Sequence, residues 1–166
     1  MNKVILQWGD FMKIKLIDLR AFPIDILKLI KGGVECDYIF SLKKEDQIDF
    51  NLLSPSGLFS NLSIEGWCYF LPIAQREWLN NYTKIIDDFF YSFCFNFTYE
   101  IDDEYDIGTL LSMIDKDNLI RLRDWLIYVL VFKSEQKFVK NSEDNIRLMI
   151  VRINDYLGGD NIFLRG

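Results

Sequence analysis

No histidine occurs anywhere in this chain of 166 residues. Histidine is the commonest general base near neutral pH and the commonest metal ligand, so its absence excludes the usual Ser-His-Asp triad and most zinc sites. The chain also lacks a Walker-type phosphate loop and a G-x-G-x-x-G motif, which leaves the standard glycine-loop nucleotide sites without support. These absences favour a non-enzymatic protein with no cofactor.

Cysteine is scarce, with only Cys36, Cys68 and Cys94, and no C-x-x-C pair occurs. An odd count without a disulfide framework favours a reducing compartment. Cys68 and Cys94 lie among aromatic residues and are predicted to be small core residues. The longest uninterrupted apolar run, residues 125–132, is far shorter than a membrane span, and the N-terminal stretch is too short and too polar for a secretory signal. We therefore expect a soluble, cytoplasmic protein without a membrane partner.

Basic residues are too dispersed to form a nucleic-acid site. The net charge is −6, and the longest basic groupings are the Lys43-Lys44 pair and the Arg121/Arg123 pair. A protein of this charge is repelled by phosphate backbones and by anionic membrane surfaces. Nucleic acid is therefore not an expected partner.

Apolar and aromatic residues, by contrast, are abundant. Half of the residues are hydrophobic and 16% are aromatic, which is enough to bury a substantial core and argues against intrinsic disorder. No composition change or linker divides the chain, so a single globular domain is predicted over residues 1–166. The sequence leaves open whether residues 1–11 are ordered.

The first third of the chain carries the predicted strands. Residues 12–19 begin with alternating Lys and Ile, and the runs 37–42 and 46–53 are β-branched or aromatic. The polar residues between those two runs would let them pair as a hairpin. Residues 21–33 instead show the apolar spacing and the terminal glycines of a helix.

The remaining two thirds are predicted to be helical. Ser63, Thr83, Asp115 and Ser142 can each cap the start of a helix, and a Gly-Gly pair closes the last one. Pro72 must kink or restart the first of these helices, because proline supplies no amide donor. The fold class is therefore α+β, a mainly helical single domain with a small strand element in the N-terminal third.

An acidic segment at residues 100–108, EIDDEYDIG, is the clearest candidate site. Read as an EF-hand loop from Asp102, it offers oxygen ligands at the first, third and fifth positions, but it needs glycine sixth and glutamate twelfth. Ile107 and Met113 occupy those two positions, so a calcium loop is not supported. Paired carboxylates could serve glycoside hydrolysis, yet any acidic surface carries such pairs. Neither a metal site nor a catalytic site is expected here.

The negative charge is concentrated around this segment. Residues 85–118 hold nine acidic side chains and one basic side chain, a charge of −8, whereas the rest of the chain has a charge of +2. A field of one sign steers a partner of the opposite sign and speeds its association. The acidic residues are Asp87, Asp88, Glu100, Asp102, Asp103, Glu104, Asp106, Asp115 and Asp117.

Two interpretations of the acidic segment stay open. The simpler one is a solvated loop whose charge keeps an aromatic-rich protein soluble. The other is a surface for a basic partner, because tyrosine residues flank the carboxylates and tyrosine is enriched at interfaces. On that interpretation the binding residues are Tyr99, Glu100, Asp102, Asp103, Glu104, Tyr105 and Asp106.

Two stretches, SIEGWCYFLPIAQREWL at 63–79 and IDKDNLIRLRDWLIYVL at 114–130, resemble a family of small uncharacterised bacterial proteins. Members of that family show an aromatic-aromatic-Leu-Pro segment followed by a further helix that a short polar cap opens. In general character the chain is also similar to bacterial toxin-immunity proteins and small phage-encoded inhibitors. That resemblance implies tight binding to a toxin, commonly over the toxin's active site.

The leading hypothesis is therefore a non-enzymatic inhibitor or immunity protein. Its carboxylates would mimic phosphates in a basic cleft of a toxin or nuclease, and its tyrosines would be buried anchors. The alternative is an assembly or adaptor subunit that associates, with itself or with other proteins, through an apolar helical face such as residues 125–132. The sequence does not identify the partner or the stoichiometry.

Overall fold

The computed structural model describes residues 14–21, 23–32, 37–43, 48–53, 58–80, 83–99 and 105–158. Several features discussed above lie outside these ranges, namely residues 1–11, Cys36 and most of the acidic segment, Glu100 to Glu104.

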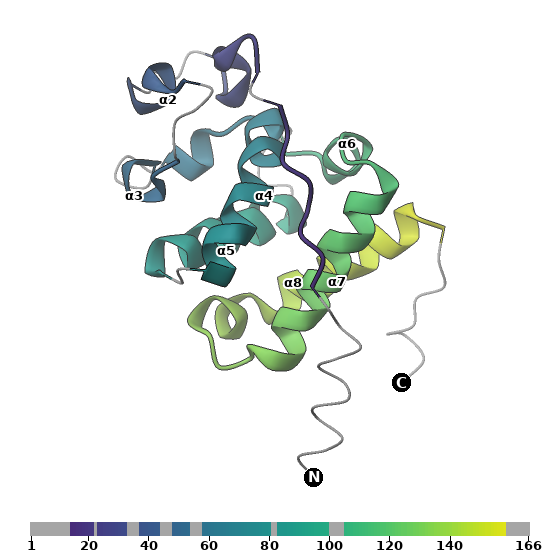
Figure 1. The fold of residues 1–166 in the computed structure, drawn as a ribbon. Coiled ribbons are helices and arrows are strands. Elements are labelled where there is room, and N and C mark those ends of the chain that lie inside the picture. The colour runs from purple at the N-terminus through teal and green to yellow at the C-terminus, as the bar shows by residue number, and fades with distance from the viewer. Residues whose placement is uncertain are drawn as a thin grey trace.

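The described chain is built from helices, with four long ones in its C-terminal two thirds (Figure 1). Most of the short elements come first, and the long helices enclose the core. In chain order the elements are η1 (Ile26–Leu29), α2 (Asp37–Ser41), α3 (Phe50–Leu53), η2 (Leu58–Asn61), α4 (Ile64–Asn80), α5 (Lys84–Tyr99), α6 (Ile107–Ser112), α7 (Lys116–Phe132) and α8 (Lys137–Tyr156).

The prediction of an α+β fold is wrong. No strand forms within the described ranges, and the β-type pairing there is an isolated antiparallel bridge between Ile30 and Leu62. The run 37–42 forms the single-turn helix α2, and the end of the run 46–53 forms α3. In short apolar runs, periodicity alone does not distinguish a strand from a buried helical turn, which explains why strands were predicted here.

The other two predictions for the N-terminal third need correction as well. The strand expected over residues 12–19 does not form among the described residues: residues 14–20 have no regular secondary structure, and side chains of α4 and α7 bind them instead of a neighbouring strand. The helix expected over residues 21–33 is reduced to the 3-10 turn η1, which Asp25 caps. Ile24 is fully exposed, so the apolar spacing that suggested a longer helix does not correspond to a buried face.

Two of the predicted caps are confirmed by short hydrogen bonds. The hydroxyl of Ser63 accepts a hydrogen bond from the amide of Gly66 at 3.0 Å, and the carboxylate of Asp115 accepts one from the amide of Asn118 at 3.0 Å. Thr83 caps α5 more weakly, at 3.4 Å. Pro72 does not restart a helix, because α4 runs through it without interruption.

The last helix begins earlier than predicted. α8 starts at Lys137, one turn and a half before Ser142, and Ser142 is a buried interior residue instead of a cap. Phe138 and Val139 are both buried, so packing of this first turn outweighs the capping preference of serine. The predicted end is confirmed, since Gly158 follows the helix with a φ of +70°.

An aromatic core lies where α4 and α8 pack against α5, and α7 packs against α8. Trp67 on α4 is completely buried, with ring centroids of α5 phenylalanines 5.0–6.1 Å away, at Phe89, Phe93 and Phe97. Trp125 of α7 joins the same core through Phe90, at 4.5 Å. Within the described ranges no helix combines the length and the apolar character that a membrane crossing requires.

The prediction that Cys68 and Cys94 are core residues is confirmed, since both are buried. Burial raises the pKa of the Cys68 thiol to about 11 and that of the Cys94 thiol to about 12. Both groups are therefore neutral thiols at pH 8, and the thiolate is the form that reacts.

We expect both thiols to resist alkylation in the native protein. In a C36S variant, a colorimetric thiol reagent at pH 8 should react with Cys68 and Cys94 slowly without denaturant and immediately in 8 M urea. Immediate reaction of both thiols in the native variant would contradict the burial of these side chains. The wild-type chain serves as the control for the contribution of Cys36.

Candidate protein-binding surface

Tyr99 ends α5, and its side chain is 60% exposed. It is therefore on the surface, immediately before the acidic segment that begins at Glu100. Four of the predicted binding residues follow it and lie outside the described ranges: Glu100, Asp102, Asp103 and Glu104.

Tyr105 lies in the core and not on the surface, since only 2% of it is exposed. Its hydroxyl donates a hydrogen bond to the carbonyl of Leu62 at 2.9 Å, and its ring packs on Phe97. The ammonium of Lys31 lies 4.1 Å from the ring centroid, which is the geometry of a cation–π contact. Tyr105 thus joins the acidic segment to the core, and we remove it from the predicted contact surface.

Asp106 is the N-cap of α6. Its carboxylate accepts hydrogen bonds from the Thr109 hydroxyl at 2.6 Å and from the Thr109 amide at 2.7 Å. These bonds hold the pKa of the Asp106 carboxyl below its usual range. Asp115 does the same for α7, where bonds from the Asn118 amide and side chain lower the pKa of its carboxyl. Part of the negative charge around the acidic segment therefore has a capping role.

These two caps predict a loss of stability in acid. A carboxyl whose pKa is lowered by folding stabilises the native state above its unfolded pKa, near about 4, and this stabilisation is lost as the pH falls through the folded pKa. The urea midpoint should therefore drop between pH 5 and pH 2.5. In the D106N/D115N variant, asparagine still caps but does not titrate, so the drop should be smaller. An identical pH dependence would show that neither cap contributes.

Three aromatic side chains form a ladder along the exposed face of α5. They are one helical turn apart, at Tyr91, Phe95 and Tyr99. The rings of Tyr91 and Phe95 are stacked, with centroids 5.8 Å apart and planes 12° apart, and Phe95 meets Tyr99 edge-on at 5.1 Å. Tyr91 is 38% exposed, so the ladder presents ring surface to solvent over about two helical turns.

A groove of about 310 Å³ lies between this ladder and the first half of α8. The Thr98 hydroxyl donates to the carbonyl of Asn145 at 3.4 Å, which joins the two helices beside it. The groove therefore has an aromatic wall from α5 and a polar wall from α8. The α8 residues that line it are Lys140, Asn141, Glu143, Asp144 and Asn145.

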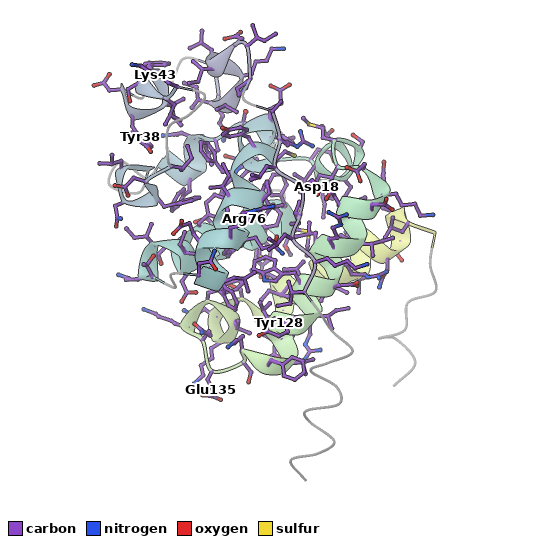
Figure 2. The ribbon with its side chains drawn as sticks, in the orientation of Figure 1. Asp18, Tyr38, Lys43, Arg76, Tyr128 and Glu135 are labelled. Carbon is purple, nitrogen blue, oxygen red and sulfur yellow. The ribbon has the colours of Figure 1, made fainter. Side chains whose placement is uncertain are left out.

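The charged residues of the polar wall differ in their partners. Lys140 pairs with Glu135 at 2.8 Å, and Glu143 pairs with Arg147 one turn further along α8, at 2.7 Å. Figure 2 labels Glu135 in the turn before α8. Asp144 is exposed and forms no hydrogen bond or ion pair with another residue of the described ranges. Its carboxylate is therefore available to a cationic group that enters the groove.

The sequence prediction included Tyr99 but missed Tyr91, Phe95 and the α8 wall. Spacing at i, i+4 and i+8 places three aromatic residues on one side of a helix, and this signal was present in the sequence. This spacing was difficult to recognise because α5 contains many other aromatic residues, most of which face the core. The contribution of α8 follows from tertiary packing and has no local sequence signal.

The apolar run 125–132, the alternative association face, is partly buried. Its residues Trp125, Leu126 and Val129 are buried in the protein core, whereas the Val131 side chain is exposed. Tyr128 packs against Phe132 at its edge.

Among the described residues, no group of three or more Cys, Asp or Glu side chains is arranged to hold a metal ion. No protein-family model, no curated protein and no solved structure matches this chain. The resemblance to small bacterial proteins and to immunity proteins therefore stays a prediction from the sequence.

Proposed function

We propose that this chain is a non-enzymatic, cytoplasmic inhibitor or immunity protein that binds a basic protein, such as a toxin or nuclease. The binding surface would comprise Tyr99 with the acidic segment, Glu100, Asp102, Asp103, Glu104 and Asp106, extended along α5 by Tyr91 and Phe95. The observation that carries this proposal is the exposed aromatic ladder, which ends one residue before the acidic segment.

The chemistry of this surface suits arginine-rich partners. A guanidinium group stacks on aromatic faces and binds carboxylates through two parallel hydrogen bonds, so it can use both walls of the groove. The exposed rings of Tyr91 and Tyr99 offer the faces, and Asp144 offers a carboxylate across the groove. The charge of −8 over residues 85–118, of which Asp87 is buried, would draw such a partner toward the chain.

We expect charge neutralisation of the acidic segment to release the partner. The tagged chain would be incubated with a lysate of its host, washed at low and then at high salt, and the bound protein identified by mass spectrometry. The D102N/D103N/E104Q/D106N variant should retain about tenfold less of the basic protein than the wild type, because steering and rim ion pairs are both lost. Asparagine still caps α6 at position 106, so the variant keeps its fold.

A matched variant controls for the change in net charge. D37N/E77Q/D124N/D155N removes the same number of carboxylates outside the 85–118 window and should retain the partner as the wild type does. Y99A should weaken retention as well, since exposed tyrosines are common binding hot spots. Equal retention by the four-fold acidic variant and the wild type would contradict the proposal. Recovery of the chain alone, indifferent to salt, would favour self-association.

A further inference from the structure

Asn145 is the buried polar residue of the groove between the aromatic ladder and α8, named here the α5–α8 groove. Only 7% of Asn145 is exposed, and its backbone carbonyl accepts the hydrogen bond from Thr98. Its side-chain amide forms no hydrogen bond with any residue of the described ranges. Buried polar groups nearly always have a partner, so an amide that lines a groove without one is suited to bind a polar molecule there.

The amide of Asn145 can be reached from the groove. On the same helix, the Ser142 hydroxyl has no hydrogen-bond partner among the described residues and is fully enclosed, whereas the Asn145 amide is not fully enclosed. The oxygen of an asparagine amide accepts hydrogen bonds. The α5–α8 groove therefore offers a hydrogen-bond acceptor at a buried position as well as the exposed rings of the ladder.

The charges that line the groove cancel except for one carboxylate. Lys140 is bound to Glu135 at 2.8 Å, and Glu143 is bound to Arg147 at 2.7 Å. Asp144 is the carboxylate that remains without an ion pair within the described ranges. The groove thus has one uncompensated negative charge and is complementary to a single cationic group.

The two cationic side chains of proteins differ in how well they fit these walls. A guanidinium is planar, stacks on aromatic faces and carries five donors in a fixed fork. It can therefore stack on the Tyr99 ring, bind the Asp144 carboxylate and still donate to the Asn145 amide oxygen. A lysine ammonium is a compact, strongly hydrated point charge and does not stack in this way.

Building on the function proposed above, we propose that the α5–α8 groove binds one arginine side chain of the basic partner. Asp144 and Asn145 are the residues that select arginine over lysine. The acidic segment and the groove then act at different stages of binding. Charge on the acidic segment speeds association and is screened by salt, whereas the short-range contacts of the groove slow dissociation.

Three small probes test the groove without the partner. The isotope-labelled chain would be titrated by NMR with N-acetyl-arginine amide, with N-acetyl-lysine amide, which keeps the charge without the plane, and with N-acetyl-citrulline amide, which keeps the plane without the charge. We expect the arginine probe to shift the signals of Tyr99 and the side-chain amide signals of Asn145, with a Kd severalfold lower than that of either other probe. Equal affinities for the three probes would overturn the proposal.

Single variants locate the site. D144N should weaken binding of the arginine probe by about threefold, the effect of one exposed ion pair. D88N is the matched control, because it removes an exposed carboxylate of α5 that does not line the groove, and it should bind the probe as the wild type does. N145A should reduce the preference for arginine over lysine. An arginine affinity that is the same in D144N and D88N would also overturn the proposal.

The capture experiment described above can fail independently of these titrations. Loss of the basic protein from the D102N/D103N/E104Q/D106N variant, together with equal affinities for the three probes, would support the proposed function and overturn the arginine site. Selective binding of the arginine probe by a chain that retains no basic protein from the lysate would support the guanidinium site and contradict the proposed function.

Discussion

Replacing Trp67 with alanine is expected to lower the free energy of unfolding by about 3–5 kcal/mol, the range for a fully buried tryptophan. Trp67 is completely buried, and its ring contacts Phe59 of η2 and three phenylalanines of α5. Its removal therefore leaves a cavity at the point where the N-terminal third meets the long helices. Urea unfolding followed by circular dichroism measures the loss.

Trp67→Phe is the matched variant. The indole nitrogen of Trp67 has no hydrogen-bond partner within the described structure, so replacement by phenylalanine breaks no hydrogen bond and removes a buried donor. We expect W67F to lose less than half of what W67A loses. If W67A cost under about 1 kcal/mol, the site would be tolerant to truncation and the packing described here would be wrong.

Gly66→Ala is expected to have the second-largest effect. A Cβ atom at Gly66 would lie 2.0 Å from the backbone carbonyl oxygen of Leu29, and no rotamer change relieves a clash with backbone. The same carbonyl accepts a hydrogen bond from the Ser63 amide at 3.1 Å, so moving it breaks the contact of η1 with α4. Overpacking costs about 1–3 kcal/mol, and a clash with backbone belongs at the upper end of this range. Alanine regains at most about 1 kcal/mol of helix propensity, so a net loss of about 2 kcal/mol is expected.

Gly108→Ala controls for the effect of alanine in a first helical turn. Gly108 lies two residues after the α6 cap and Gly66 lies three residues after the α4 cap, but a Cβ at Gly108 would meet its nearest atom, an Asp106 oxygen, at 3.4 Å. Urea midpoints should therefore be nearly unchanged for G108A and clearly lower for G66A. Equal midpoints for the two variants would show that η1 does not pack on α4 in this way.

Local signals predicted the C-terminal two thirds of the fold well. The caps at Ser63 and Asp115 and the terminal Gly158 act through hydrogen bonds and backbone angles within one helical turn, so the sequence alone carries them. The start of α8 was missed because burial of Phe138 and Val139, a tertiary effect, extends the helix beyond Ser142.

The N-terminal third could not be predicted in the same way. The extended segment, residues 14–20, is held by hydrogen bonds to residues 58 to 105 positions away, such as Gln75 and Arg121. No local sequence pattern predicts these contacts. The alternating residues at the start of this segment predicted a strand, which does not form among the described residues. The sequence could not show that the partners would be side chains of helices instead of another strand.

In the candidate site, too, local features could be predicted from the sequence, whereas features that depend on tertiary packing could not. Tyr99 and Tyr105 look equivalent in sequence, since each flanks the carboxylates, yet one is exposed and the other is bonded to Leu62 in the core. The helical spacing of Tyr91, Phe95 and Tyr99 was readable from the sequence, whereas their groove with α8 was not.

The long sequence separations of the extended segment also set an order of events during synthesis. Arg121 must leave the ribosome before the Leu16 carbonyl can be bound, so the segment waits for about a hundred residues to be added, which takes roughly 5–20 seconds at cellular rates. Long-range contacts of this kind form late because loop closure must precede them. We expect residues 14–20 to dock only after α7 has been synthesised, and to be accessible to solvent until then.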